Sequence, residues 1–138
     1  MSIKIILDSP QFEHKRIYID EYRTDLAVKG LKKLICDGIV YTDSVYLAKI
    51  DYNCLYGIPS DENSGAHYPL QIFSRGSTIL ISGVSAGYGG EGPHGTLECL
   101  KLLGFKLSEE ERQKVLTKSL DAFGNENPDI HLEFQKSY

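Results

Sequence analysis

Apolar residues in the first third of the chain follow two periods, one typical of strands and one typical of a helix. An almost continuous apolar run at residues 3–7 is typical of a strand covered on both faces, so we predict a central strand there. A second strand is predicted at Lys15–Ile19. From about Glu21 to Asp37 the apolar positions recur every three to four residues, which predicts a helix capped by Asp20 and ended by Gly38.

β-branched and tyrosine residues dominate the middle of the chain. The segment from Ile39 to Tyr56 favours a strand, and its alternation predicts one face that is formed by Tyr46, Ala48, Ile50 and Tyr52. The polar stretch at 58–66 is predicted as a surface loop. Two further strands, at 70–73 and 78–84, are close enough to form a hairpin that turns at 75–77.

The last third of the chain carries two helix signals and one strand signal. A short apolar helix is predicted from Thr96 to Leu103, where Gly104 ends it. Ser108 and Glu111 have the spacing of a capping box, which predicts a third helix that extends to about Phe123. A final strand is indicated by the alternating apolar residues Ile130, Leu132 and Phe134.

Together these patterns predict a single domain over residues 1–138, with about six strands and three helices. Most of the strands precede the last two helices and do not alternate with them. This order favours an α+β fold with a mixed or antiparallel sheet over a doubly wound one.

The composition is that of an ordinary globular domain, and it excludes several classes of function. Apolar residues make up 41% of the 138 residues, charged residues make up 25%, and the net charge is −4. Such a chain lacks the basic excess of a general nucleic-acid binder, so no nucleic-acid polymer is expected as a partner. No apolar run approaches the roughly 20 residues that cross a membrane. With widely spaced cysteines and no secretory pattern, the protein is expected to be cytoplasmic.

Metal binding and nucleophilic catalysis have little support in the sequence. The three cysteines form no CxxC pair and the four histidines show no HExxH spacing, so neither a metal site nor a cofactor is expected. The GxSxG motif of hydrolases is absent. Cys99 is interpreted as core, and Cys54 lacks an adjacent base. An enzyme that uses His94 as a base with Glu91 stays open, but we lean against catalysis and assign no catalytic residue.

The most unusual part of the chain is rich in glycine. Six of the 13 glycines fall within the 13 residues from Gly83 to Gly95, and Gly87–Gly92 matches the pattern GxGxxG. The dinucleotide-binding motif of that form needs a helix directly after the third glycine and an acidic strand end about 20 residues further on, and neither is expected here. A Walker loop is excluded because the chain contains no GKS or GKT.

The glycines of this segment are more numerous than a turn requires, and each costs conformational entropy on folding. We therefore predict that a ligand approaches this backbone closely, with a long irregular connector as the alternative. Arg75 is the only lysine or arginine between Lys49 and Lys101, so the hypothesis includes a site completed across a homo-oligomer interface. The predicted ligand-binding residues are Tyr88, Gly89, Gly90, Glu91, Gly92, His94, Gly95, Thr96 and Arg75.

Two functions from different classes fit these features. The first is a small non-catalytic binding protein, a sensor or sequestering protein, for a nucleotide-like or phosphorylated small molecule, with the 58–66 loop as a lid. The second is an immunity or inhibitor-type protein that blocks a toxin or enzyme through an acidic, tyrosine-bearing surface. Tyrosines are frequent between the first helix and the glycine-rich segment, which fits a binding surface and ordinary strand packing equally well.

Overall fold

Six strands and three α-helices make up the part of the chain that the structure describes. The structure is a computed structural model, and it describes residues 3–9, 14–21, 23–51, 68–84, 91–117 and 131–136. The strands are β1 (Ile3–Ser9), β2 (His14–Ile19), β3 (Val45–Asp51), β4 (Leu70–Ser74), β5 (Ser77–Ile81) and β6 (His131–Gln135). The helices are α1 (Thr24–Cys36), α2 (Glu91–Leu102) and α3 (Glu109–Thr117), with a short 3-10 helix η1 (Thr42–Ser44).

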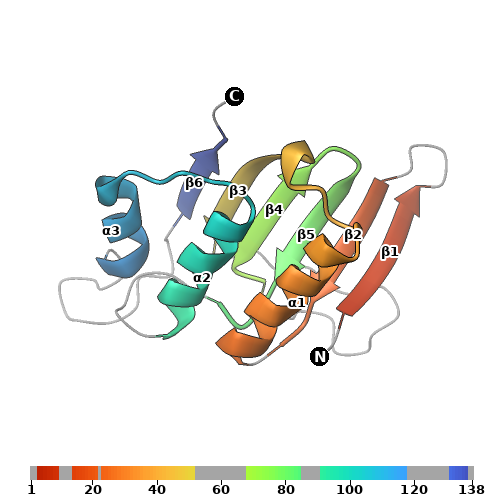
Figure 1. The fold of residues 1–138 in the computed structure, drawn as a ribbon, viewed down its shortest axis with the longest axis horizontal. Coiled ribbons are helices and arrows are strands. Elements are labelled where there is room, and N and C mark those ends of the chain that lie inside the picture. The colour runs from red at the N-terminus through yellow and green to blue at the C-terminus, as the bar shows by residue number, and fades with distance from the viewer. Residues whose placement is uncertain are drawn as a thin grey trace.

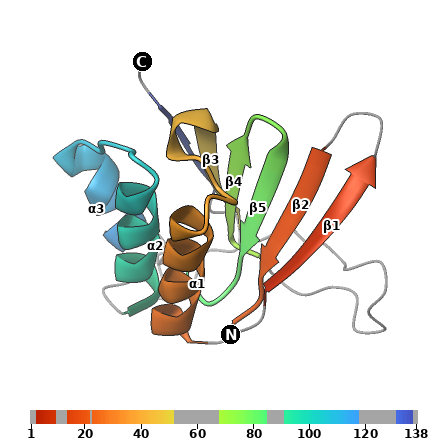
Figure 2. The same cartoon turned by 45° about the vertical axis from the view of Figure 1, so that its right-hand side comes forward.

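The strands form one sheet in the order β1-β2-β5-β4-β3-β6. β2 and β5 run parallel, while the other four neighbouring pairs are antiparallel, so the sheet is mixed. The three helices lie on one face of the sheet, with α1 and α2 side by side and α3 toward the β6 end (Figures 1 and 2). The predicted α+β class, with six strands in a mixed sheet and three helices, is confirmed.

The main core lies between the sheet and the helices. Leu31 and Leu34 of α1 are buried there with Ile17 and Ile19, which share one face of β2 as predicted. A smaller apolar cluster occupies the opposite face of the sheet and consists of Tyr18, Tyr68 and Leu80. Its two tyrosine rings pack edge to face, with centroids 5.2 Å apart. The sheet is therefore apolar on both faces near β2 and β5.

β1 lies at the edge of the sheet, so the prediction of a central strand at residues 3–7 is wrong. Ile5 is 48% exposed, and β1 extends with β2 beyond the helices (Figure 2). The apolar run has another cause, because alternate residues of β1 face two apolar layers. Ile3 packs against the main core, while Ile6 packs against the Tyr18 cluster on the other face. Two-sided packing produces the same sequence pattern at an edge as in the centre.

A register shift in β3 changes which residues share its faces. The pairing of β3 with β4 shifts between Val45 and Leu47. As a result Val45, Ala48 and Ile50 are all buried in the main core, while Tyr46 is 47% exposed. The prediction that Tyr46 shares the face of Ala48 and Ile50 is therefore wrong, because an irregularity breaks the simple alternation of a strand.

Of the four cap signals in the sequence, Gly38, Gly104 and the Ser108–Glu111 box are confirmed, whereas Asp20 is not. Arg23, and not Asp20, occupies the N-cap of α1. Gly38 follows α1 with a φ of +73°, the left-handed conformation expected of a helix stop. The capping box before α3 is confirmed, because the Glu111 N–H donates to Ser108 Oγ (3.2 Å) and the Ser108 N–H donates to Glu111 Oε1 (3.0 Å).

The parallel strands β2 and β5 have their C-terminal ends side by side, at the end of the sheet where α1 begins. Hydrogen bonds join the two strand ends, since the Thr24 hydroxyl donates to the Gly83 carbonyl (2.7 Å) and the Glu21 N–H donates to Ser82 Oγ (2.8 Å). Gly83 has a φ of +81°, and a Cβ there would lie 2.7 Å from the Glu21 carbonyl oxygen. Only glycine fits at this position.

Some predictions concern residues outside the described part of the chain. They are the lid loop at 58–66, Tyr52 at the end of its predicted strand, Cys54, and the continuation of the third helix beyond Thr117. Within the described part, none of the helices has the length and apolar character needed to span a bilayer.

Candidate functional site

The last five residues of the glycine-rich segment are helical. α2 begins at Glu91, five residues before the predicted start at Thr96, so Gly92, His94 and Gly95 lie within its first turns. Gly92, Gly95 and Thr96 are buried, and the Thr96 hydroxyl donates to the Gly92 carbonyl at 3.3 Å. The prediction of an irregular loop up to Gly95 is wrong, because these residues form a helix that packs against the rest of the protein.

Gly95 is required by the close approach of two helices. A Cβ built on Gly95 would overlap Cγ2 of Thr24, and it would lie 3.2 Å from Cγ1 of Val84. α2 therefore lies closer to α1 and to the end of β5 than a larger residue would allow. Packing accounts for this glycine without a ligand.

One face of α2 lines an open groove on the helical side of the molecule. The side chains of this face follow helical spacing: His94, Leu97, Glu98, Lys101 and Leu102. Other walls come from α1, from the segment after α2 and from α3, through Lys32, Phe105, Lys106, Leu107 and Arg112. The groove has a volume of about 880 Å³. Small-molecule sites usually have volumes of roughly 300–1,000 Å³, so the groove is large enough to hold a ligand.

A smaller hollow of about 320 Å³ adjoins the groove near the start of α2. The two depressions share Lys32, His94 and Glu98. The remaining lining of the hollow comes from the first turns of α1 and α2: Thr24, Asp25, Val28, Lys29, Glu91 and Gly95. Three predicted site residues, Glu91, His94 and Gly95, are therefore brought together beside one depression.

Positive charge is concentrated in the groove. Its lining includes one carboxylate, that of Glu98, and four basic side chains, those of Lys32, Lys101, Lys106 and Arg112. Lys32 Nζ lies 3.5 Å from Glu98 Oε1, and Arg112 makes a long ion pair of 3.9 Å with a glutamate of its own helix. Among the residues that the structure describes, neither Lys101 nor Lys106 has an ion-pair partner. The groove therefore has an excess of positive charge on a chain whose net charge is −4.

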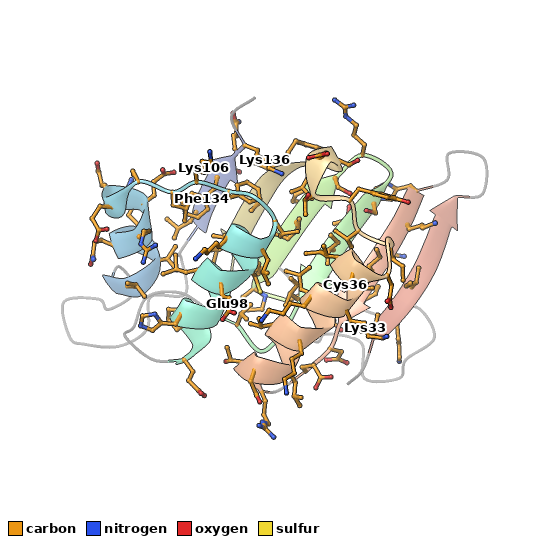
Figure 3. The ribbon with its side chains drawn as sticks, in the orientation of Figure 1. Lys33, Cys36, Glu98, Lys106, Phe134 and Lys136 are labelled. Carbon is orange, nitrogen blue, oxygen red and sulfur yellow. The ribbon has the colours of Figure 1, made fainter. Side chains whose placement is uncertain are left out.

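The wall of the groove at Phe105 is supported from the C-terminal strand. Lys136 Nζ lies 5.9 Å from the Phe105 ring centroid and donates to the Thr42 carbonyl. Gly104 has a φ of +89°, and a Cβ there would lie 3.0 Å from Lys136 Nζ. Figure 3 shows Lys106 and Lys136 at the same end of the molecule, beyond the middle of α2 where Glu98 lies. Lys136 is held by these contacts, which leaves Lys101 and Lys106 as the lysines available to a ligand.

The structure does not bring Arg75 to the groove. Arg75 lies in the turn between β4 and β5, whereas Gly95 packs on Val84 beyond the other end of β5. A five-residue strand spans about 16 Å, and the β4–β5 turn and the start of α2 lie at opposite ends of the sheet (Figure 1). Tyr88, Gly89 and Gly90 lie outside the described residues.

Sequence reasoning missed the basic residues of the groove. The lysines of α1 have the pattern of a solvated helix face, and Lys32 is indeed exposed, yet it also faces α2. The predicted helix from Thr96 to Leu103 already has Glu98 and Lys101 on one face, and extending it back would have added His94 to that face. The contribution of Arg112 depends on how α3 packs, for which the sequence carries no local signal.

Cys99 does not have the features of a catalytic nucleophile. Burial raises the pKa of the Cys99 thiol to about 12, and the neighbouring Glu98 carboxylate adds to this rise. The thiol therefore stays protonated near neutral pH. Cys36 is exposed at the end of α1. Within the described ranges, no group of three or more His, Cys, Asp or Glu side chains is suited to hold a metal ion.

Comparison with known proteins does not assign the groove. No protein-family model, curated protein or solved structure matches the chain. The interpretation of the groove therefore rests on its own shape, lining and charge.

Proposed function

We propose that the protein is a small non-catalytic binding protein that takes a nucleotide-like or phosphorylated small molecule in the groove along α2. The observation that carries this proposal is the group of four basic side chains around an apolar groove, on an acidic chain. Basic side chains that line the same groove repel one another, and an anion bound between them reduces that repulsion. A sensor or sequestering protein of the cytoplasm is the role that fits such a site.

The apolar lining meets the second requirement of a nucleotide-like ligand. Leu97, Leu102, Phe105 and Leu107 line the groove between its charged side chains. A planar base packs well against such side chains, while phosphate oxygens accept hydrogen bonds from lysine and arginine. Gly92 and Thr96 have no role in this binding, because both are buried on the face of α2 that packs against the rest of the protein.

A second candidate function, that of an immunity or inhibitor protein, is favoured by a different surface. Tyr41 and Tyr46 flank η1 and are 67% and 47% exposed. Large exposed tyrosines are typical of protein interfaces. A protein partner that binds here would depend on these two side chains and not on the basic residues of the groove.

Thermal unfolding in the presence of nucleotides and sugar phosphates tests the proposal. A ligand at 100 times its Kd adds about 2.7 kcal/mol to the free energy of unfolding, so we expect a rise in Tm of several degrees. The double variant Lys101→Glu/Lys106→Glu should lose this rise because it turns the basic end of the groove acidic.

The matched control is Lys4→Glu/Lys15→Glu, which changes the net charge equally at two exposed residues outside the groove lining. This control should keep the rise in Tm. If no small molecule in the panel stabilises the wild-type protein, and a protein partner binds through Tyr41 and Tyr46, the immunity function replaces the present proposal.

A further inference from the structure

We propose that the ligand is a nucleotide whose phosphates lie at the C-terminal end of α2, between Lys101, Lys106 and Arg112, and whose base lies against the apolar wall of the groove. This inference rests on the proposed function and adds the class of ligand and its orientation. The orientation is opposite to the usual one, in which a phosphate binds at the start of a helix.

The start of α2 offers a phosphate no excess of basic side chains. Glu91 is exposed at the first position of α2, and with Asp25 and Glu98 it places three carboxylates around the smaller hollow. Lys29 and Lys32 line the same hollow, and Arg23 binds the Asp25 carboxylate at 2.7 Å, so three basic side chains balance the three carboxylates. Only the partial positive charge of the helix N-terminus, about half a unit, remains to attract a phosphate there.

The other end of the groove has an excess of positive charge, because its basic side chains outweigh the partial negative charge of about half a unit at a helix C-terminus. Lys101 belongs to the last turns of α2, Lys106 to the segment after it, and Arg112 to α3, so three separate parts of the chain supply cations. Glu98 lies nearly one turn before Lys101 and is already paired with Lys32. Lysine and arginine side chains that line one groove can together bind several phosphate oxygens.

The length of the groove suits a ligand with two chemically different ends. His94 and Lys101 are seven residues apart, so α2 rises about 10 Å between them. Leu97 lines the groove between them. A base packed on Leu97 would have His94 and Glu98 beside it, and these side chains supply a donor and an acceptor for its polar edge. The phosphates would then extend toward Lys101.

Calorimetric titration of the full chain with a graded series of ligands tests this inference. The series contains inorganic pyrophosphate, a sugar phosphate, adenosine, guanosine, and the mono-, di- and triphosphates of both nucleosides. We expect at least one nucleoside diphosphate to bind ten times more tightly or better than both its nucleoside and pyrophosphate. Such a result requires separate contacts for the base and for the phosphates.

Variants at the two ends of α2 test the orientation. Lys101→Gln and Lys106→Gln should each weaken binding of the diphosphate tenfold or more, and should leave binding of the nucleoside unchanged. Glu91→Gln is the matched control at the other end, and we expect it to change either affinity less than twofold. All three side chains are exposed, so the variants should fold, which circular dichroism checks.

Three results would overturn the inference while leaving the proposed function intact. In the first, pyrophosphate binds as tightly as the nucleotide. In the second, a sugar phosphate binds more tightly than any nucleotide. In the third, Glu91→Gln tightens nucleotide binding and Lys101→Gln does not weaken it. If none of the phosphorylated compounds binds the wild-type chain, the proposed function fails as well.

Discussion

Gly95 of α2 and Thr24 of α1 meet with no room for a side chain between them. A Cβ on Gly95 would overlap the Thr24 methyl group, while the Thr24 hydroxyl donates to the Gly83 carbonyl at 2.7 Å. This contact sets the distance between the two helices and brings Lys32 of α1 within 3.5 Å of Glu98. The sequence predicts that a ligand approaches Gly95. In the structure Thr24 lies against Gly95, and this contact sets the spacing of α1 and α2, which both line the groove.

Gly95→Ala should destabilise the protein by about 1–3 kcal/mol, the usual cost of overpacking a core. Alanine favours a helix over glycine by about 1 kcal/mol, so stability would be lost although the substitution raises the helix propensity of α2. The added methyl group must displace Thr24 or Val84, both of which are held by packing. Urea denaturation followed by circular dichroism measures the change in the free energy of unfolding.

A second substitution identifies the contact that is responsible. Thr24→Ser removes the methyl group and keeps the hydroxyl that donates to Gly83, so adding it to Gly95→Ala should recover at least half of the lost stability. A Gly95→Ala variant as stable as the wild type would contradict the packing explanation and return this glycine to the ligand hypothesis.

The capping box before α3 gives a second prediction about stability. Ser108→Ala removes the oxygen that accepts from the Glu111 N–H and should lower the free energy of unfolding by about 1 kcal/mol. Glu110→Ala is the control, since it removes an exposed residue from the same turn without touching the box. Equal effects of the two variants in thermal unfolding would show that the box contributes nothing of its own.

The Cys99 thiol predicts a dependence of stability on alkaline pH. Its pKa is about 12 in the folded protein against 9.0 for an unperturbed thiol, so the unfolded state loses the proton first as pH rises. The contribution of Cys99 to the free energy of unfolding is therefore full below pH 9 and is lost between pH 9 and 12. The slope is at most about 1.4 kcal/mol per pH unit.

Comparison with Cys99→Ala isolates this effect from the titration of lysines and tyrosines. The variant should lose stability less steeply than the wild type as the pH rises above 9. Urea denaturation at a series of pH values measures both slopes. Parallel slopes would mean that the Cys99 thiol ionises as easily in the folded protein as in the unfolded one.

Local sequence signals determined most of the fold. Gly38 and Gly104 end their helices in the left-handed conformation, and Ser108 with Glu111 caps α3, because these devices act within a few residues. The position of β1 could not be predicted in the same way. Ile6 is partly buried by a cluster of residues distant in sequence, including Tyr68, and no local pattern shows on which side of a sheet such a cluster lies.

The candidate site was predicted only in part. His94 and Glu91 line the depression that the structure shows, although they do so from a helix and not from a loop. Glycine content alone cannot distinguish a backbone that approaches a ligand from one that approaches a neighbouring helix, as at Gly95. Lys106 and Arg112 reach the groove through tertiary packing, so their contribution could be seen only in the structure.

The central claim is that the groove along α2 binds a phosphorylated ligand, and an amide NMR titration of the labelled chain with nucleotides tests it most directly. We predict that saturable shift changes will be confined to residues 94–107 and to the neighbourhood of Lys32 and Arg112. Shift changes confined to the β4–β5 turn around Arg75 or to the surface around Tyr41 would contradict the account, as would the absence of any change.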